Sequence, residues 1–105
     1  MSQFDKREKG FEEKHRRDQE LEFKVQARRN KLLGLWAAEK LGLSGAEADA
    51  YAKEVIVSDF DEPGDDDVLR KVHGDLEGKG IDISEHLVRK EMDKLLEAAR
   101  KELSD

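Results

Sequence analysis

The first twenty residues are too highly charged to belong to a hydrophobic core. Twelve of them carry charged side chains, six acidic and six basic, and only Met1, Phe4 and Phe11 could bury apolar surface. The segment contains no proline, and its charges fall at spacings that allow ion pairs along a helix. We therefore expect residues 1–20 to form an arm, helical or partly disordered, that buries its two phenylalanines against a partner.

The remaining residues, 21–105, have the pattern of one small helical domain. Charged residues make up 44% of the chain, proline occurs once, and β-branched residues never build into the alternating runs that indicate strands. Apolar residues recur instead at spacings of three and four, as in amphipathic helices. We predict an all-α fold, in which residues 21–105 form an antiparallel four-helix bundle that carries the arm.

The first predicted helix runs from the arm to about residue 41. Arg29 falls on its apolar face and interrupts it, and we expect Trp36 to be a core residue. An unbroken helix would place Phe4 and Phe11 roughly in line with the same face, so the arm could continue this helix. The apolar residues that define the face are Leu21, Val25, Leu32 and Trp36.

Turn and capping signals predict the other three helices. The second covers about 45–60 and starts with a capping box formed by Ser44 and Glu47. The break at 62–64 makes Asp65 the expected N-cap of the third helix, which glycines at 78 and 80 end. The fourth helix is expected to start at Asp82 or Ser84.

Metal and enzyme chemistry find little support in the sequence. The chain has no cysteine, and His15, His73 and His86 lack the spacing of metal ligands. The acidic stretch 59–70 resembles a calcium loop only in part, because Pro63 and Arg70 occupy two of its ligand positions. We expect no metal and no cofactor, with His73 on the bundle surface. Known nucleophile and phosphate-loop motifs are missing, so we do not expect an enzyme.

Charge and hydropathy restrict the partners. The net charge of −6 argues against nucleic acid, and no apolar run approaches the length of a membrane span. We expect a cytoplasmic protein that is not embedded in a membrane.

A basic cluster at Arg28, Arg29 and Lys31 has two interpretations. With an acidic excess in the helices that follow, the cluster can form internal salt bridges. Alternatively, it can bind phosphate or an acidic partner.

The segment ARRNKLLG at 27–34 is a specific combination of residues for a helix. It occurs together with LWAAE at 35–39, ELEFK at 20–24, EPGD at 62–65 and the opening FDKREKGFEEK at 4–14. With these segments, nearly the whole chain resembles the zeta subunit family of alphaproteobacterial F-type ATP synthases.

The resemblance implies a four-helix bundle with an N-terminal inhibitory arm. Such an arm inserts at a catalytic interface of the synthase head and reaches the rotor, so that it blocks rotation in the direction of ATP hydrolysis. His15 and Arg16 depart from the aromatic residue and alanine often found in the family, which reduces the apolar area the arm can bury. The implied contact residues are Phe4, Arg7, Glu8, Phe11, Glu12, Lys14, Asp18 and Glu20.

Two other functions remain open from the residues themselves. The protein could be a scaffold or interaction protein whose arm binds a different target. It could also be a nucleotide-responsive helical module that binds phosphate through Arg28, Arg29 and Lys31.

Overall fold

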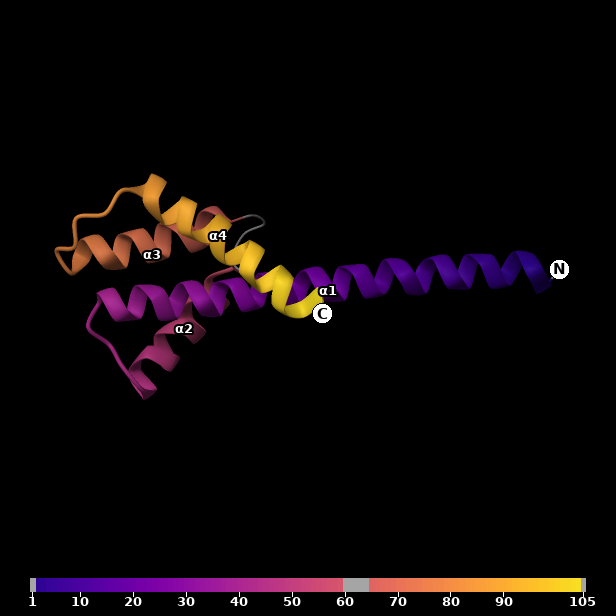
Figure 1. Ribbon diagram of the computed structural model, residues 1–105, viewed down its shortest axis with the longest axis horizontal. Coiled ribbons are helices and arrows are strands. Elements are labelled where there is room, and N and C mark those ends of the chain that lie inside the picture. The colour runs from indigo at the N-terminus through magenta and orange to yellow at the C-terminus, as the bar shows by residue number, and fades with distance from the viewer. Residues whose placement is uncertain (1, 60–64, 105) are drawn as a thin grey trace.

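The computed structural model is built from four α-helices that reverse direction one after another (Figure 1). The structure describes the backbone of residues 2–59 and 65–104 and the side chains of residues 19–59 and 65–103. No strand occurs in these ranges, and the predicted all-α four-helix fold is confirmed. The helices are α1 (Ser2–Lys40), α2 (Ala46–Ser58), α3 (Asp66–Gly78) and α4 (Glu85–Ser104).

Helix α1 gives the molecule its elongated shape. Its C-terminal half contacts all three other helices, while its N-terminal half extends away from them (Figure 1). The Cα radius of gyration is 17.4 Å, and the molecule measures 65 × 25 × 21 Å. A compact domain of this length would have a radius of gyration of about 13 Å. The difference reflects the projecting half of α1.

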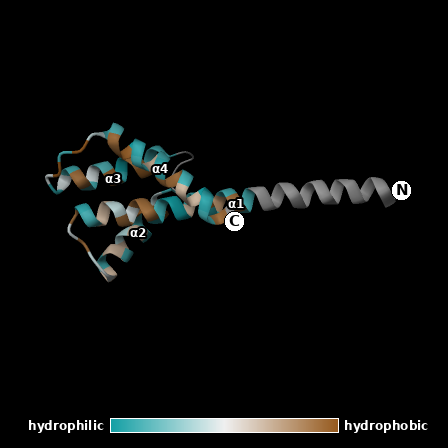
Figure 2. Ribbon diagram, in the orientation of Figure 1, coloured by the Kyte–Doolittle hydropathy of each residue, from teal (hydrophilic) through white to brown (hydrophobic). Residues whose placement is uncertain are grey.

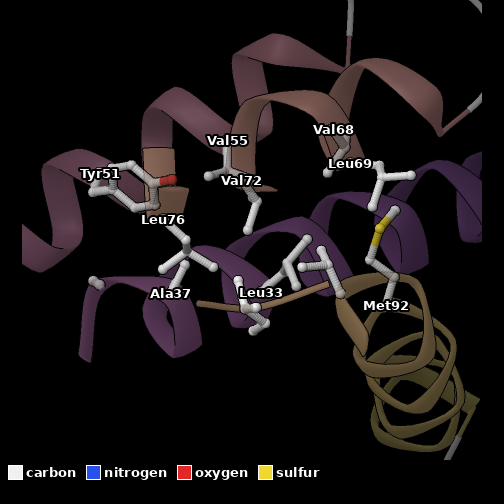
Figure 3. Close-up of a cluster of buried hydrophobic side chains, with 12 residues drawn as sticks. Leu33, Ala37, Tyr51, Val55, Val68, Leu69, Val72, Leu76 and Met92 are labelled. Atoms are coloured by element: carbon white, nitrogen blue, oxygen red, sulfur yellow. The ribbon is translucent and has the colours of Figure 1, made fainter. Parts of the chain in front are cut away.

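The core lies where the C-terminal half of α1 meets the other helices (Figure 3). Hydrophobic and hydrophilic residues share each bundle helix, as expected for helices with one face in a core (Figure 2). Helix α3 buries four apolar residues, namely Val68, Leu69, Val72 and Leu76. The core also contains Leu33, Ala37, Ala38, Tyr51, Val55, Ile83, Val88 and Met92.

The buried face of α1 differs from the predicted one. Val25 is fully buried as expected, but Leu21 is 38% exposed. Leu21 lies close to the point where α1 leaves the bundle, so little of the core is available to cover it. Trp36 is only partly buried; it packs against the core, and the Lys40 Nζ atom lies 5.0 Å from the centre of its ring.

The start of α2 corrects the predicted capping box. Gly45, not Ser44, is the N-cap residue, and no side chain caps the helix among the described residues. Gly45 has φ 57° and ψ −128°, a conformation that a residue with a Cβ adopts only under strain. The chain therefore enters α2 through a glycine turn that does not bring a serine hydroxyl to the helix end.

The starts of α3 and α4 agree with the prediction. Asp65 is the N-cap residue of α3, although its carboxylate does not cap the helix. At α4, the backbone N–H of Leu87 donates to the Ser84 Oγ atom at 3.1 Å, so Ser84 is a side-chain cap.

None of the helices in the described ranges is long and apolar enough to span a bilayer.

Candidate functional site

The arm is the N-terminal half of a continuous helix. Helix α1 begins at Ser2 and passes through the predicted arm boundary at residue 20 without interruption. At ~1.5 Å per residue, the arm is about 30 Å long. The division into an arm at 1–20 and a bundle at 21–105 stays a prediction, because one helix spans both.

All eight predicted contact residues lie on this projecting helix. Their backbone is helical, but seven of their side chains lie outside the described residues, so the predicted contacts stay predictions. The eighth, Glu20, is described and is exposed. The residues whose side chains are not described are Phe4, Arg7, Glu8, Phe11, Glu12, Lys14 and Asp18.

The base of the arm is joined to the end of α4 by ion pairs. Arg100 donates from both Nη atoms to the two carboxylate oxygens of Glu22, at 3.0 and 3.1 Å. Arg28 donates from Nε to Glu102 at 2.8 Å. Sequence reasoning missed these pairs, because the partners lie more than seventy positions apart in the chain.

The three residues of the basic cluster, Arg28, Arg29 and Lys31, lie in different environments. Arg28 is partly exposed and pairs with Glu102 on α4, whereas Arg29 is only 2% exposed. Lys31 is exposed beside an open cavity of about 320 Å³, which is also lined by Asp49 and Lys53 of α2. Two of the three cations thus form the internal salt bridges that one interpretation of the sequence expects. Phosphate binding by Arg28, Arg29 and Lys31 stays a prediction.

The buried Arg29 forms an ion pair with the partly exposed Asp65, and this pair joins α1 to the start of α3. Its Nη2 atom donates to the Asp65 Oδ1 atom at 2.8 Å, and its Nε atom donates to the Asn30 Oδ1 atom at 2.9 Å. The hydrogen bond from Arg29 holds the pKa of the Asp65 carboxyl below its usual value, although partial burial opposes this shift. The arginine that interrupts the apolar face is therefore satisfied inside the bundle.

The neighbouring acidic residues are also paired. Asp66 accepts a hydrogen bond from Arg89 of α4 at 2.9 Å, and Asp67 accepts one from Arg70 at 2.8 Å. Among the described residues, no group of three or more histidine, aspartate or glutamate side chains is arranged to hold a metal ion. The acidic start of α3 connects this helix to α1 and α4.

His73 corrects a further prediction. Its side chain is 14% exposed, and its Nε2 atom lies 3.0 Å from the carbonyl oxygen of Ile83. Glu77 and Glu85 lie on either side of the ring, at 3.3 and 3.9 Å from its nitrogens. His73 therefore lies between α3 and the segment before α4, and is mostly covered.

A polar network that the sequence did not reveal joins α2 to α3. The Tyr51 hydroxyl donates to Asp75 at 2.8 Å, and Lys71 lies 3.1 Å from the same carboxylate and 3.5 Å from Glu54. Burial, followed by the hydrogen bond to Asp75, raises the pKa of the Tyr51 hydroxyl. The hydroxyl therefore keeps its proton and is the hydrogen-bond donor that links α2 to α3.

These features define an all-helical protein in which the first helix of a four-helix bundle projects beyond the other three. The chain belongs to the ATPase inhibitor subunit zeta family, whose profile matches residues 1–102. Its fold is also similar to that of a protein determined by NMR in solution, with a TM-score of 0.72 and 53% sequence identity. That match covers 81% of this chain and 96% of the other. No curated protein sequence matched.

Membership of this family supports an ATPase-inhibitory role for the chain, as the resemblance in the sequence implied. Such a role is regulatory. Binding to the ATP synthase is the interaction that such a role requires.

Proposed function

We propose that this protein inhibits ATP hydrolysis by the F-type ATP synthase through insertion of its N-terminal arm at a catalytic interface of the head. The inserted arm reaches the rotor and blocks rotation in the hydrolytic direction. The bundle stays outside and acts as a stop. The protein itself catalyses no reaction, requires no cofactor, and acts in the cytoplasm as a peripheral component of the membrane-bound synthase.

The observation that carries this proposal is the continuous helix α1. Its N-terminal half extends away from the bundle, where it is accessible to another protein (Figure 1). An isolated helix of this length and charge is only marginally stable in water, whereas one that grows from a packed helix needs no new nucleus. The bundle therefore supplies a helical start for the arm, and a partner surface would supply the remaining stabilisation.

The proposal assigns the contacts with the head to the residues implied by the family. Phe4 and Phe11 would bury apolar surface at the interface, at about 25 cal/mol per Å². The charged contacts would be Arg7, Glu8, Glu12, Lys14, Asp18 and Glu20.

A hydrolysis assay with purified synthase tests the arm mechanism. We expect the full-length protein to inhibit hydrolysis, and a version lacking residues 1–19 to lose inhibition while its bundle remains folded by circular dichroism. Retention of inhibition without the arm would refute insertion.

Single substitutions sharpen this test. Phe11→Ala should weaken inhibition by roughly ten-fold or more, as expected for loss of a buried aromatic ring at an interface. Val57→Ala is the matched control, because Val57 is 60% exposed on α2 and lies outside the proposed contact. Equal effects of the two substitutions would contradict a specific role for the arm. If the full-length protein neither inhibits nor co-purifies with the synthase, a scaffold function replaces this proposal.

A further inference from the structure

The ion pairs at the base of the arm lie where α1 stops being part of the core. Val25 is fully buried, whereas none of the side chains from 19 to 24 is buried. Glu22 lies on the arm side of this limit, and Arg28 lies on the bundle side. The C-terminal end of α4 comes close to α1 in the same region (Figure 1). We call the Glu22–Arg100 and Arg28–Glu102 pairs the α1–α4 clamp.

The charges of the clamp alternate on both helices. Helix α1 contributes an acid and then a base, and α4 contributes a base and then an acid. A shift of α4 along α1 that brought Arg100 to Arg28, or Glu102 to Glu22, would place like charges together. Both pairs therefore oppose a displacement of α4 that would separate them.

The contact at Glu22 has the geometry of a specific pair. The Arg100 guanidinium binds both carboxylate oxygens, so it fixes the direction of the Glu22 side chain as well as its distance. Residue 22 is almost one helical turn before Val25. The pair with Arg100 therefore holds the helical turn between Glu22 and Val25 against α4, and the helix continues from this turn into the arm.

We propose that the α1–α4 clamp positions the arm, and that Arg100 of the C-terminal helix is a positioning residue for binding by the N-terminal helix. The proposal rests on the proposed function, because the partner of the arm is the head of the ATP synthase. The clamp sets the direction in which the arm leaves the bundle. An arm with a fixed direction loses less conformational freedom on binding.

All four side chains are between 38 and 51% exposed, so the effect is modest and depends on salt. For such pairs we expect changes of roughly two- to ten-fold in inhibitory potency.

Charge reversal and charge exchange test the clamp directly. The variants are Arg100→Glu, Glu22→Arg and the double exchange that carries both. Because the chain has no cysteine, spin labels can be attached to Glu13→Cys in the arm and Lys53→Cys in α2 without other changes. We expect a narrow distance distribution in the parent chain, a broad one in each reversal, and recovery in the exchange.

Inhibition of the purified synthase is measured with the unlabelled variants. Each reversal should raise the half-inhibitory concentration by roughly two- to ten-fold, and the exchange should restore it. Lys101→Glu is the matched control, because it makes the same charge change at an exposed position next to Arg100. It should leave both the distance distribution and the inhibition unchanged.

The outcomes separate this proposal from the function on which it rests. Unchanged distances in the reversals, or inhibition that fails to respond when the distances do, would overturn the positioning role. A failure of the exchange to restore both measurements would also overturn it. If the distances respond as expected but the parent chain does not inhibit the synthase, the clamp stands and the proposed target is wrong.

Discussion

Gly34 marks a close contact between α1 and α2. A Cβ atom built at this position would lie 2.6 Å from the Ala52 Cα atom and 3.1 Å from its Cβ atom. Because a backbone atom cannot yield as the end of a long side chain can, the two helices would have to separate. The small residue is therefore needed for packing, although glycine disfavours a helix.

We expect Gly34→Ala to lower the free energy of unfolding by about 1–3 kcal/mol, because the overpacking outweighs the gain in helix propensity. Gly74→Ala in α3 is the matched control, since a Cβ there meets nothing within 4 Å. The control should stabilise the protein by about 0.5–1 kcal/mol. Urea unfolding measures both, and stabilisation by both substitutions would show that α1 and α2 do not approach as closely as described.

The Arg29–Asp65 pair makes the stability of the fold depend on pH in the acid range. The pKa of the Asp65 carboxyl in the folded protein lies below the unfolded value of about 4. The pair therefore contributes fully to the free energy of unfolding above that value. The contribution is lost as the pH falls from about 4 toward the native pKa, because the carboxylate takes up a proton. We expect Asp65→Asn to cost about 1 kcal/mol at pH 7, because it leaves the buried Arg29 without an ionised partner, although solvent screening at the partly exposed Asp65 weakens the loss.

Urea unfolding between pH 7 and pH 2.5 checks this expectation. The difference between the parent chain and Asp65→Asn should shrink below about pH 4. Asp49→Asn serves as the control, because Asp49 is exposed on α2. A difference that stays constant across this range would mean that the charge of Asp65 does not stabilise the fold.

At the level of helices, α2 and α4 begin with different kinds of N-cap. Ser84 caps α4 with its hydroxyl, whereas α2 begins at Gly45 without a side-chain cap. Two serines that look alike in the sequence thus have different roles. The reason is the turn at Gly45, which does not bring the Ser44 hydroxyl to the start of α2.

We expect Ser84→Ala to destabilise the protein by about 1 kcal/mol, the usual cost of losing a side-chain cap. Ser44→Ala should change the free energy of unfolding by less than about 0.5 kcal/mol. Thermal or urea unfolding of the two variants provides the comparison. Similar losses from both would restore the capping box that the sequence predicts at α2.

The sequence predicts the helices well because the relevant signals are local. The apolar spacing in α3, the glycines after it and the serine before α4 all act within a few residues. The partner of Arg29 could not be predicted, because Asp65 lies 36 positions away and meets it only once α1 and α3 are packed. The α1–α4 clamp was missed for the same reason.

The candidate site is predictable in its position but not in its detail. A highly charged segment with two phenylalanines indicated an arm, and the structure places its backbone beyond the bundle (Figure 1). Nothing in the spacing of residues around 20 shows where the packing of α1 ends. That limit depends on how far α4 extends, and among the described side chains it puts the first fully buried residue of α1 at Val25.

At the scale of the whole molecule, folding of the bundle should not depend on the arm. Among the described side chains, the buried residues of α1 begin at Val25. We expect a chain that lacks residues 1–19 to have a melting temperature within about 3 °C of the full-length protein, since a surface change usually alters stability by under 0.5 kcal/mol. Calorimetry measures this, and a larger decrease would show that the arm packs on the bundle.

Because α1 runs without a break from Ser2 to Lys40, the bundle and the arm share one rotational phase. Each residue inserted after Glu20 turns one part against the other by about 100° around the helix axis. Two inserted alanines would turn the bundle by about 200°, whereas seven would return it to within about 20° of its original angle but about 10 Å further away. Comparing the inhibition given by these two insertions would show whether the proposed partner, the head of the synthase, responds to the rotational angle of the bundle or only to its distance.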